Sequence, residues 1–371
     1  MATDKIRVGI IGANLQAGWG TRAHLPAIKA LPGLEVVAVC TTRQETANET
    51  AKHFGIPVAL ADYHKLVTHP EVDLVSVCVR VPFHHELVMA ALNAGKHVFC
   101  EWPLGATTAQ AIEMRDLAHR KGVRHMIGLQ ARGGPAVNRI RDLVAQGYVG
   151  QVQCATVIAA GQPVAATLPA AATWRLDRAN GVNLMTIAGG HTLDALAFCL
   201  GEFRELSATV ATQRKQVTVA ETGATLSATA PDQVIVNGTL RSGAVACVQV
   251  KGAAVGVPFR FEIHGSEGDL IVASADVNQR AGVNYAELTI HGARHGEKAL
   301  SEQAVPDSYR WVPASVPAGP PYNVAQLFSR LADAIRAGRD VDNSFDLAVQ
   351  RHQELDAIQR ASDSGQRQAL A

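Results

Sequence analysis

The chain has 371 residues, of which 47% are hydrophobic and 18% are charged, and its formal net charge at pH 7 is +1. A chain of this length exceeds what one hydrophobic core usually serves, so we expect two domains. The near-neutral charge, without a run of lysine and arginine, argues against nucleic acid or an anionic membrane surface as a direct partner.

The six cysteines lie far apart and never form a Cys-x-x-Cys pair. We therefore expect small buried thiols in a reducing compartment, and no zinc or other metal site. No apolar stretch is long enough to span a bilayer, and the first residues lack the basic and apolar regions of a signal peptide. Together these features predict a cytoplasmic protein without a membrane partner.

The first predicted strand covers residues 6–11 and ends at Gly12, and a helical pattern extends from Thr21 to Leu31. In Rossmann units, a glycine loop between strand and helix lets the backbone approach a pyrophosphate at the helix N-terminus. The glycine spacing is irregular here, so phosphate binding and an ordinary turn both fit the loop alone. The candidate cofactor contacts in the loop are Gly12, Asn14, Gln16, Gly18 and Trp19.

Apolar strands and helix-length segments then alternate as far as residue 131. This alternation predicts a parallel sheet with helices on both faces, whose ligands bind beyond the carboxyl ends of the strands. The predicted strands are 34–40, 73–79, 97–100 and 125–129, and the predicted helices are 44–54, 83–94 and 107–120. The loops that should share one rim begin at Gly12, Thr41, Arg80, Glu101 and Gln130.

The second strand is followed by Thr41, Thr42 and Arg43. An acidic residue at this point bonds the ribose hydroxyls of NAD, whereas an arginine with small polar residues accommodates the phosphate of NADP. The three residues therefore favour NADP, or the use of both NADP and NAD. The alternative is that the two threonines only cap the following helix.

The pattern changes after Gly150, where short strands separated by turn signals predict an antiparallel sheet. The interrupting helix, residues 190–200, carries His191 and Asp194 one turn apart on one face. Two amphipathic helices end the pattern. The predicted strands are 152–160, 204–211, 234–240, 245–251, 260–264, 270–273 and 287–290, and the final helices are 322–338 and 345–362.

These patterns predict an α/β chain with two domains. The first, residues 1–131, is a Rossmann domain with a doubly wound parallel sheet. The second, residues 132–371, is an α+β domain with an open, mostly antiparallel sheet. We expect helices 322–362 to pack back on the Rossmann domain.

Several stretches share the motifs of a known family. Residues 73–79, then Pro82 and His84, and residues 90–101 with Pro103 resemble the signature of the Gfo/Idh/MocA oxidoreductases. This resemblance implies that the first domain binds NAD or NADP. It also implies that the second domain carries a small-molecule substrate, often a sugar or cyclitol, and often the interface of a homo-oligomer. Further matching stretches are 128–132, Trp174-Arg175, His191-x-x-Asp194, 262–268 and 334–338.

The resemblance also supplies further site residues. It places His84 near the nicotinamide, and Glu101 close to the ribose, whereas His85 is expected in solvent. The loop with Gly18-Trp19, the stretch from His24 to Ile28 and the pair Glu101-Trp102 more closely resemble the branch that includes the fungal galactose-regulon repressor. That regulator binds a dinucleotide and an activator protein without known turnover. The implied cofactor contacts are Arg80, Pro82, His84, Glu101, Trp102, Gln130 and Trp174.

Two residues depart from the family pattern. Members that dehydrogenate alcohols have a lysine where Trp102 stands, and an aspartate where Ile187 stands. A tryptophan cannot take the proton of a hydroxyl group, because its indole is a donor only. Trp102 can instead stack on the nicotinamide or on a sugar face, or it can be a packed aromatic residue at the domain junction.

The remaining candidate base is His191, whose imidazole titrates in the range that proton transfer at neutral pH requires. The alternative is a structural histidine bonded to Asp194 or to a backbone carbonyl. Arg175 can hold a substrate hydroxyl or a cofactor phosphate, or it can pair with Asp177. The candidate catalytic set is therefore His191, Trp102 and Arg175.

Two functions follow. The first is an NAD(P)-dependent oxidoreductase for a sugar-like or other polyhydroxylated or carbonyl small molecule, with His191 as acid/base. The alternative is a non-catalytic dinucleotide-binding regulator or sensor, which the absence of the lysine suggests. We favour the enzyme because His191 is retained and no extra partner-binding segment is evident.

Overall fold

The computed structural model describes residues 5–16, 18–161, 165–252, 257–274 and 282–370. The chain divides into two compact units. Unit 1 consists of residues 1–133 and 310–352, and unit 2 of residues 134–309 and 353–371. The first division follows residue 133, and helix α8 (Pro320–Ala337) belongs to unit 1. Helix α9 (Phe345–Ser364) contributes residues to both units.

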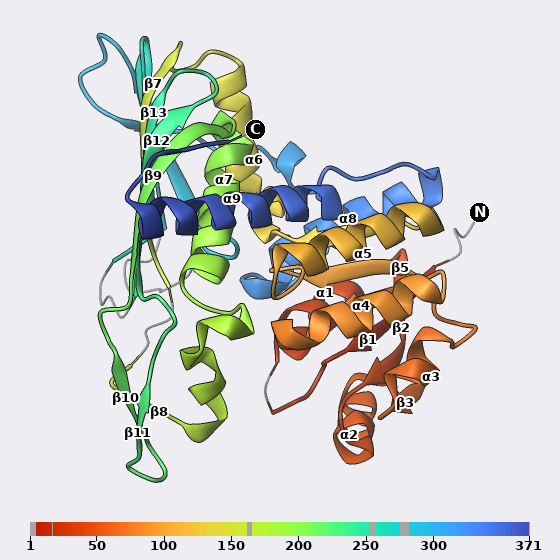
Figure 1. Ribbon diagram of the computed structural model, residues 1–371. Coiled ribbons are helices and arrows are strands. Elements are labelled where there is room, and N and C mark those ends of the chain that lie inside the picture. Colours follow the sequence, from red (N-terminus) through yellow and green to blue (C-terminus); the bar gives the residue numbers. More distant parts are fainter. Residues whose placement is uncertain (1–4, 17, 162–164, 253–256, 275–281, 371) are drawn as a thin grey trace. The chain divides into compact units, whose positions relative to one another are not determined.

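Unit 1 contains a six-stranded sheet in the order β3-β2-β1-β4-β5-β6, and all its strand pairs are parallel. This is the doubly wound Rossmann order, with the switch point between β1 and β4, and it confirms the predicted fold class (Figure 1). The strands are β1 Ile6–Ile11, β2 Leu34–Cys40, β3 Val58–Leu60, β4 Leu74–Val77, β5 His97–Glu101 and β6 His125–Gly128. The other helices are α1 Leu25–Lys29, α2 Gln44–Phe54, α3 Tyr63–Val67, α4 His84–Asn93 and α5 Thr108–Lys121.

Both faces of this sheet are covered, as its apolar strands require. Alternate residues of β1, such as Val8 and Ile10, belong to one buried cluster with residues of α1 and α8. On the other face, a Cβ on Gly9 would lie 2.8 Å from the side chain of Leu66 in α3. Segment β3–α3 was absent from the sequence prediction, because its elements are only three and five residues long.

The helix predicted from Thr21 to Leu31 differs in the structure. The segment begins as a π-helix, Gly20–His24, and continues as the short α1. A π-turn holds one more residue than an α-turn, and such turns are frequent at functional sites. Periodicity over eleven residues does not reveal a change of helix type within them.

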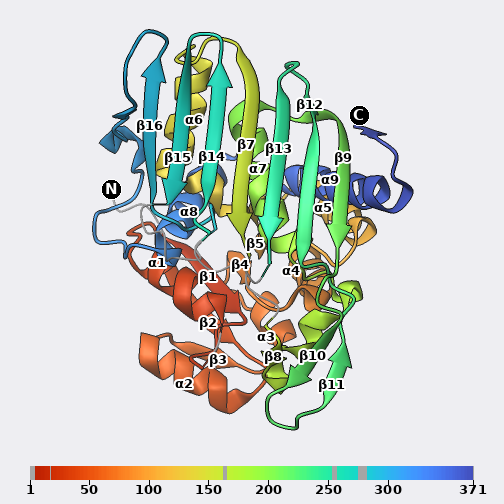
Figure 2. The same ribbon diagram turned by 90° about the vertical axis from the view of Figure 1, so that its left-hand side faces the viewer.

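Unit 2 contains a nine-stranded sheet in the order β17-β16-β15-β14-β7-β13-β12-β9-β18. Its pairs are antiparallel except for the parallel pair of β7 and β13, which confirms the mostly antiparallel prediction. Figure 2 shows helices α6 (Pro135–Ala145) and α7 (Gly190–Leu200) behind this sheet. The strands are β7 Val152–Ala160, β9 Phe203–Ala211, β12 Gln233–Leu240, β13 Val245–Lys251, β14 Arg260–Gly265, β15 Gly268–Ser274, β16 Leu288–Arg294, β17 Ser301–Glu302 and β18 Gln368–Ala369.

Buried and half-exposed residues alternate along β15, so one face of the sheet lies in the core and the other is open. Helix α7 (Gly190–Leu200) contacts β7 and the preceding helix α6 (Pro135–Ala145), which the sequence analysis missed. A three-stranded sheet, β11-β10-β8, completes unit 2. Its strands are β8 Thr167–Leu168, β10 Gln216–Val219 and β11 Thr225–Ser227.

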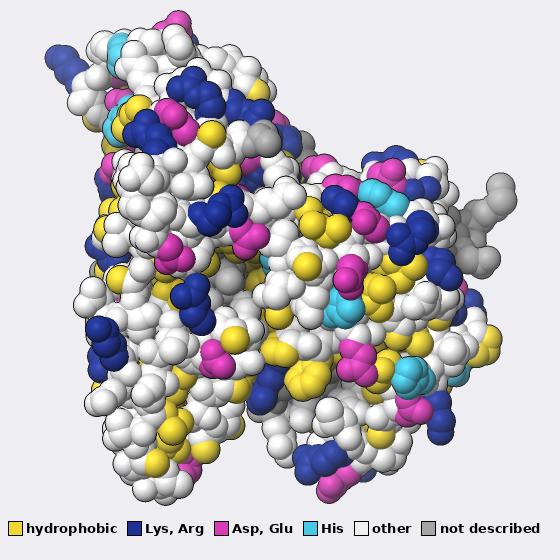
Figure 3. Space-filling view, in the orientation of Figure 1, with side chains coloured by type: hydrophobic (Ala, Val, Ile, Leu, Met, Phe, Trp, Pro, Cys, Tyr) yellow, Lys and Arg dark blue, Asp and Glu magenta, His cyan; other side chains and the backbone are white. Residues whose placement is uncertain are grey.

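Within the described ranges, no helix combines the length and the hydropathy that a membrane span requires. On the face drawn in Figure 3, basic and acidic side chains are interspersed rather than gathered by sign. That distribution agrees with the net charge of +1.

Candidate functional site

The loop after β1 approaches the neighbouring strand closely. Gly12 has a φ of +99°, and a Cβ on it would lie 2.6 Å from the backbone oxygen of Cys78. A side chain at this position would therefore be strained and would clash. The loop is tied together by Asn14, whose Oδ1 accepts from the amide of Gln16 at 3.0 Å and whose carbonyl accepts from Thr21 Oγ1 at 2.9 Å.

The three residues predicted to determine the preference for NAD or NADP differ in their exposure to solvent. Thr41 is buried, and its hydroxyl donates to the carbonyl of Arg43 at 2.9 Å and lies 2.7 Å from Thr46 Oγ1. Thr41 therefore braces the turn before α2. Thr42 and Arg43 are exposed, and neither caps α2 with its side chain.

A buried polar network beneath the rim joins the π-helix Gly20–His24 to strands β4 and β5 of unit 1. The ring of His24, which has no exposed surface, lies 2.9 Å from Ser76 Oγ through Nδ1 and 2.6 Å from Glu101 Oε1 through Nε2. Burial alone lowers the pKa of His24, but Cys78 and Glu101 outweigh this and raise it to about 10. The carboxylate of Glu101, 2.6 Å from His24 Nε2, favours the protonated form of the ring and serves as its counter-charge.

Gln130 forms the outer end of this network. Its Nε2 lies 3.0 Å and 2.7 Å from the two carboxylate oxygens of Glu101. A Cβ on Gly128 would lie 2.9 Å from Glu101 Cδ and 3.0 Å from Gln130 Nε2, so only glycine leaves room for the pair. The amide oxygen of Gln130 is buried, and it has no hydrogen-bond partner among the residues that the structure describes. A buried acceptor without a donor costs about 1–3 kcal/mol, so this oxygen suits a donor on a ligand.

Trp102 follows Glu101 and is 4% exposed. Its ring centroid lies 5.0 Å from that of His352 in α9, at an interplanar angle of 51°. Burial lowers the pKa of His352 to about 4, so this partner is a neutral imidazole at neutral pH. Trp102 is thus a packed aromatic side chain within unit 1, beside the rim of the sheet.

The predicted nicotinamide neighbour, His84, is 1% exposed. Its Nδ1 lies 2.8 Å from the carbonyl of Pro103, and its Nε2 lies 3.1 Å from the carbonyl of Val79. Burial lowers the pKa of His84. His84 thus lies between the loop after β4 and the loop after β5, with a protein carbonyl facing each ring nitrogen, and a neutral ring donates to only one of the two. Arg80 and Pro82, in the first of these loops, are exposed.

Unit 2 holds the other predicted residues. His191 and Asp194 are both buried in α7, and the π-helix Met185–Gly189, which contains Ile187, leads directly into that helix. The guanidinium of Arg175 lies 5.7 Å from the ring centroid of Trp174, a cation–π distance. The carboxylate of Asp177 accepts from the amide of Ala179 at 2.9 Å and so caps the following turn.

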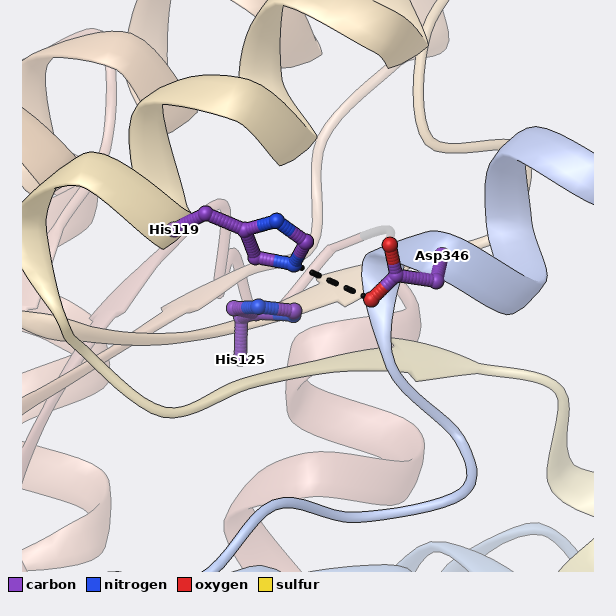
Figure 4. A group of neighbouring side chains, drawn as sticks. All are labelled: His119, His125 and Asp346. Atoms are coloured by element: carbon purple, nitrogen blue, oxygen red, sulfur yellow. Dashed lines mark hydrogen bonds and ion pairs between the residues drawn. The ribbon is translucent and has the colours of Figure 1, made fainter.

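His119, His125 and Asp346 bring three potential metal-ligating atoms within 4.8 Å of one another (Figure 4). The geometry does not suit a metal ion. His125 Nδ1 accepts from the amide of Phe345 at 3.0 Å, so the proton of the neutral ring lies on Nε2 and neither nitrogen has a free lone pair. Burial lowers the pKa of His125 to about 4, and the charge of the neighbouring His119 contributes to the same shift. His119 Nε2 is itself paired with the carboxylate of Asp346 at 3.1 Å.

Glu101 and Gln130 are predicted from the sequence, whereas His24 and Ser76 emerge as parts of the site only in the structure. Ser76 offered one signal, since it is the only polar residue of the strand Leu74–Val77. His24 follows a glycine loop, where a buried histidine needs a partner. The features that fit a dinucleotide are the close backbone at Gly12, the exposed Thr42 and Arg43, and the unpartnered oxygen of Gln130.

Two family descriptions match the chain. Residues 6–129 match the Gfo/Idh/MocA description "Oxidoreductase family, NAD-binding Rossmann fold", and residues 135–274 match "Gal80p, C-terminal domain". The chain is 32% identical over 272 residues to the 1,5-anhydro-D-fructose reductase of Ensifer adhaerens, which covers 71% of this chain and 75% of that protein.

Two further relatives differ in what they do. Dehydrogenase aclE of Aspergillus oryzae is 36% identical over 213 residues, which cover 56% of this chain and 58% of aclE. The galactose/lactose metabolism regulatory protein GAL80 of Saccharomyces cerevisiae is 29% identical over 287 residues, which cover 71% of this chain and 66% of GAL80. Both alignments span less than two thirds of these relatives.

Solved structures share the whole fold. An oxidoreductase domain protein from Kribbella flavida has a TM-score of 0.85 at 26% identity, with 100% of both chains covered. A levoglucosan dehydrogenase in complex with NADH and L-sorbose has a TM-score of 0.84 at 22% identity, also with 100% of both chains covered.

Proposed function

Because the chain belongs to the Gfo/Idh/MocA oxidoreductase family, we propose that it is an NAD(P)-dependent oxidoreductase for a sugar-like or other polyhydroxylated or carbonyl small molecule. The observation that carries the proposal is the rim of the Rossmann sheet. There, the backbone at Gly12 and the unpartnered oxygen of Gln130 offer the two kinds of contact that a nicotinamide dinucleotide needs.

Cofactor binding would use the loops of unit 1. The loop from Gly12 to Trp19 holds the pyrophosphate, and Thr42 and Arg43 receive the adenosine ribose with or without its 2′-phosphate. Arg80, Pro82, Trp102 and Gln130 line the nicotinamide end, with Glu101 and His84 holding this end in place. Trp174 of unit 2 is a further proposed contact of the cofactor. A bound nicotinamide cofactor supplies or accepts the hydride.

Proton transfer would use unit 2. His191 takes the proton of the substrate hydroxyl at a ring nitrogen, or returns it in the reverse direction. Arg175 bonds a substrate hydroxyl through its guanidinium. Trp102 takes no proton, and shapes the pocket with its ring.

The test is a panel of sugars, anhydrosugars and carbonyl compounds with NAD and NADP, read by the absorbance of the reduced nicotinamide. We expect turnover of at least one compound, and His191→Ala should lower kcat by about 100-fold or more. The exposed His295 provides the matched control, His295→Ala, which should leave kcat unchanged. Dinucleotide binding without turnover of any compound would contradict the proposal.

A non-catalytic dinucleotide-binding regulator is the second candidate. It is favoured by Trp102 in the position of the family's lysine and by the match to the C-terminal domain of Gal80p. Affinity capture with and without NADP tests it, since a regulator should bind one partner in a cofactor-dependent way. Alcohol dehydrogenase activity gained by Trp102→Lys, but not by Trp102→Phe, would instead identify an adapted catalytic pocket.

We further propose that the protein is a cytoplasmic homo-oligomer that pairs through the open face of the nine-stranded sheet. None of the six cysteines, all of which the structure describes, forms a disulfide, and this suits a reducing compartment. On the open face Ile271 is half-buried, and its strand neighbours are Glu262 and His291. Ile271→Glu should therefore lower the molar mass measured by light scattering, whereas the exposed-site control His295→Ala should not.

A further inference from the structure

Within the described part of the chain, one buried side-chain atom of the polar network beneath the rim has no hydrogen-bond partner. Gln130 is 1% exposed, and its amide nitrogen lies within hydrogen-bond distance of both oxygens of Glu101. An ionised carboxylate only accepts hydrogen bonds, so Gln130 must turn its NH₂ toward Glu101 and its oxygen away. That oxygen is buried without a donor.

The orientation of Glu101 itself is fixed from the other side. His24 Nε2 contacts Glu101 Oε1 at 2.6 Å, and His24 Nδ1 is held by Ser76 at 2.9 Å. Glu101 is therefore clamped between His24 and Gln130. Without the positive ring of His24, the carboxylate would lose its counter-charge and its fixed rotamer, and Gln130 could turn its amide by half a rotation.

We propose that His24 is a positioning residue, which acts through Glu101 to make Gln130 present its side-chain oxygen to a ligand that carries a primary amide. The nicotinamide carboxamide is such a group, so this inference rests on the proposed function. His24 does not touch the ligand. It determines whether Gln130 accepts or donates a hydrogen bond at the rim.

The experiment compares three ligands by calorimetric titration. NADH carries the carboxamide, the reduced 3-acetylpyridine analogue carries a ketone without an N–H, and ADP-ribose lacks the nicotinamide ring. One hydrogen bond corresponds to about a tenfold preference of the wild-type protein for NADH over the acetylpyridine analogue. We expect His24→Leu to bring this ratio close to one and His24→Gln, which keeps a donor toward Glu101, to preserve much of it.

A matched control exists in the same unit. His85 Nε2 contacts Glu113 Oε2 at 2.7 Å, but the two side chains are 30% and 61% exposed. His85→Leu should leave the ratio unchanged, and all folded variants should bind ADP-ribose like the wild type. Where His24→Leu does not fold, Gly128→Ala tests the same link, because its Cβ would push Glu101 and Gln130 apart.

The outcomes separate the two proposals. Equal affinities of the wild-type protein for NADH and its acetylpyridine analogue, or an unchanged ratio in both His24→Leu and Gly128→Ala, would overturn the role of His24 while leaving dinucleotide binding intact. If neither NADH nor ADP-ribose bound, the proposed function would fail, and this inference would fail with it.

Discussion

Unit 1 contains two histidine–glutamate pairs of similar length that differ in their surroundings. His24 and Glu101 are 2.6 Å apart with side chains 0% and 13% exposed, whereas His85 and Glu113 are 2.7 Å apart with side chains 30% and 61% exposed. Water screens the second pair, and the protein must supply every partner of the first. The same two residue types are therefore a structural requirement in one place and a weak surface contact in the other.

Removal of the buried carboxylate should produce the largest effect. Glu101→Ala leaves His24 without its counter-charge and Gln130 without its acceptor, and should lower the free energy of unfolding by about 3 kcal/mol. Urea unfolding at pH 7 measures this loss. A loss no greater than that of Glu113→Ala would mean that burial does not distinguish the two pairs.

Alkaline pH should weaken the buried pair next. The pKa of His24 is raised from 6.5 to about 10 in the folded protein, so the pair's contribution is complete below about pH 6.5 and is lost as the pH rises through 10. Urea midpoints of the wild type should therefore fall between pH 7 and pH 10. His24→Gln should flatten this slope, and parallel slopes for the two proteins would contradict the assignment.

Acid should act on the buried histidines that have no carboxylate partner. Burial lowers the folded-state pKa of His352 to about 4, so stability is lost as the pH falls from about 6.5 toward 4. His352→Phe keeps an aromatic ring beside Trp102 and should reduce this acid slope. Urea midpoints between pH 7 and pH 4 measure it, and an unchanged slope would assign the loss to other groups such as His125.

The exposed pair should give the smallest effect. Glu113→Ala should change the free energy of unfolding by no more than about 0.5 kcal/mol, because solvent screens the contact and the side chain of His85 regains rotamer freedom. Urea unfolding measures this change at low and at high salt. A loss near that of Glu101→Ala would show that Glu113 has a further partner.

The sequence predicted most of the framework. The apolar run of residues 34–40 forms β2 with the bounds that the sequence predicts. The change from parallel to antiparallel strands was also predicted correctly, because helix-length segments separate the parallel strands and short turns separate the antiparallel ones. Short or irregular elements were missed, since β3, α3 and the π-turns give no sustained period.

The candidate site was predicted less completely. Glu101 and Gln130 were named from a motif, but their link to His24 depends on how the π-helix Gly20–His24 packs against β4 and β5, which brings residues 77 positions apart into contact. The burial of Trp102 and the engagement of both His84 nitrogens also depend on the neighbours that tertiary packing supplies. Sequence patterns identify residue types at a rim, but they do not show which side chain lies beneath another.

The π-turn Gly20–His24 makes the chain sensitive to insertions and deletions as well as to substitutions. A single deleted residue would convert that turn to α-helix and rotate His24 by about 100° relative to the following strands. The ring would then leave Glu101, although every residue of the network was still present. The contact between His24 and Glu101 therefore depends on the number of residues between Gly12 and His24 as well as on the identity of the side chains.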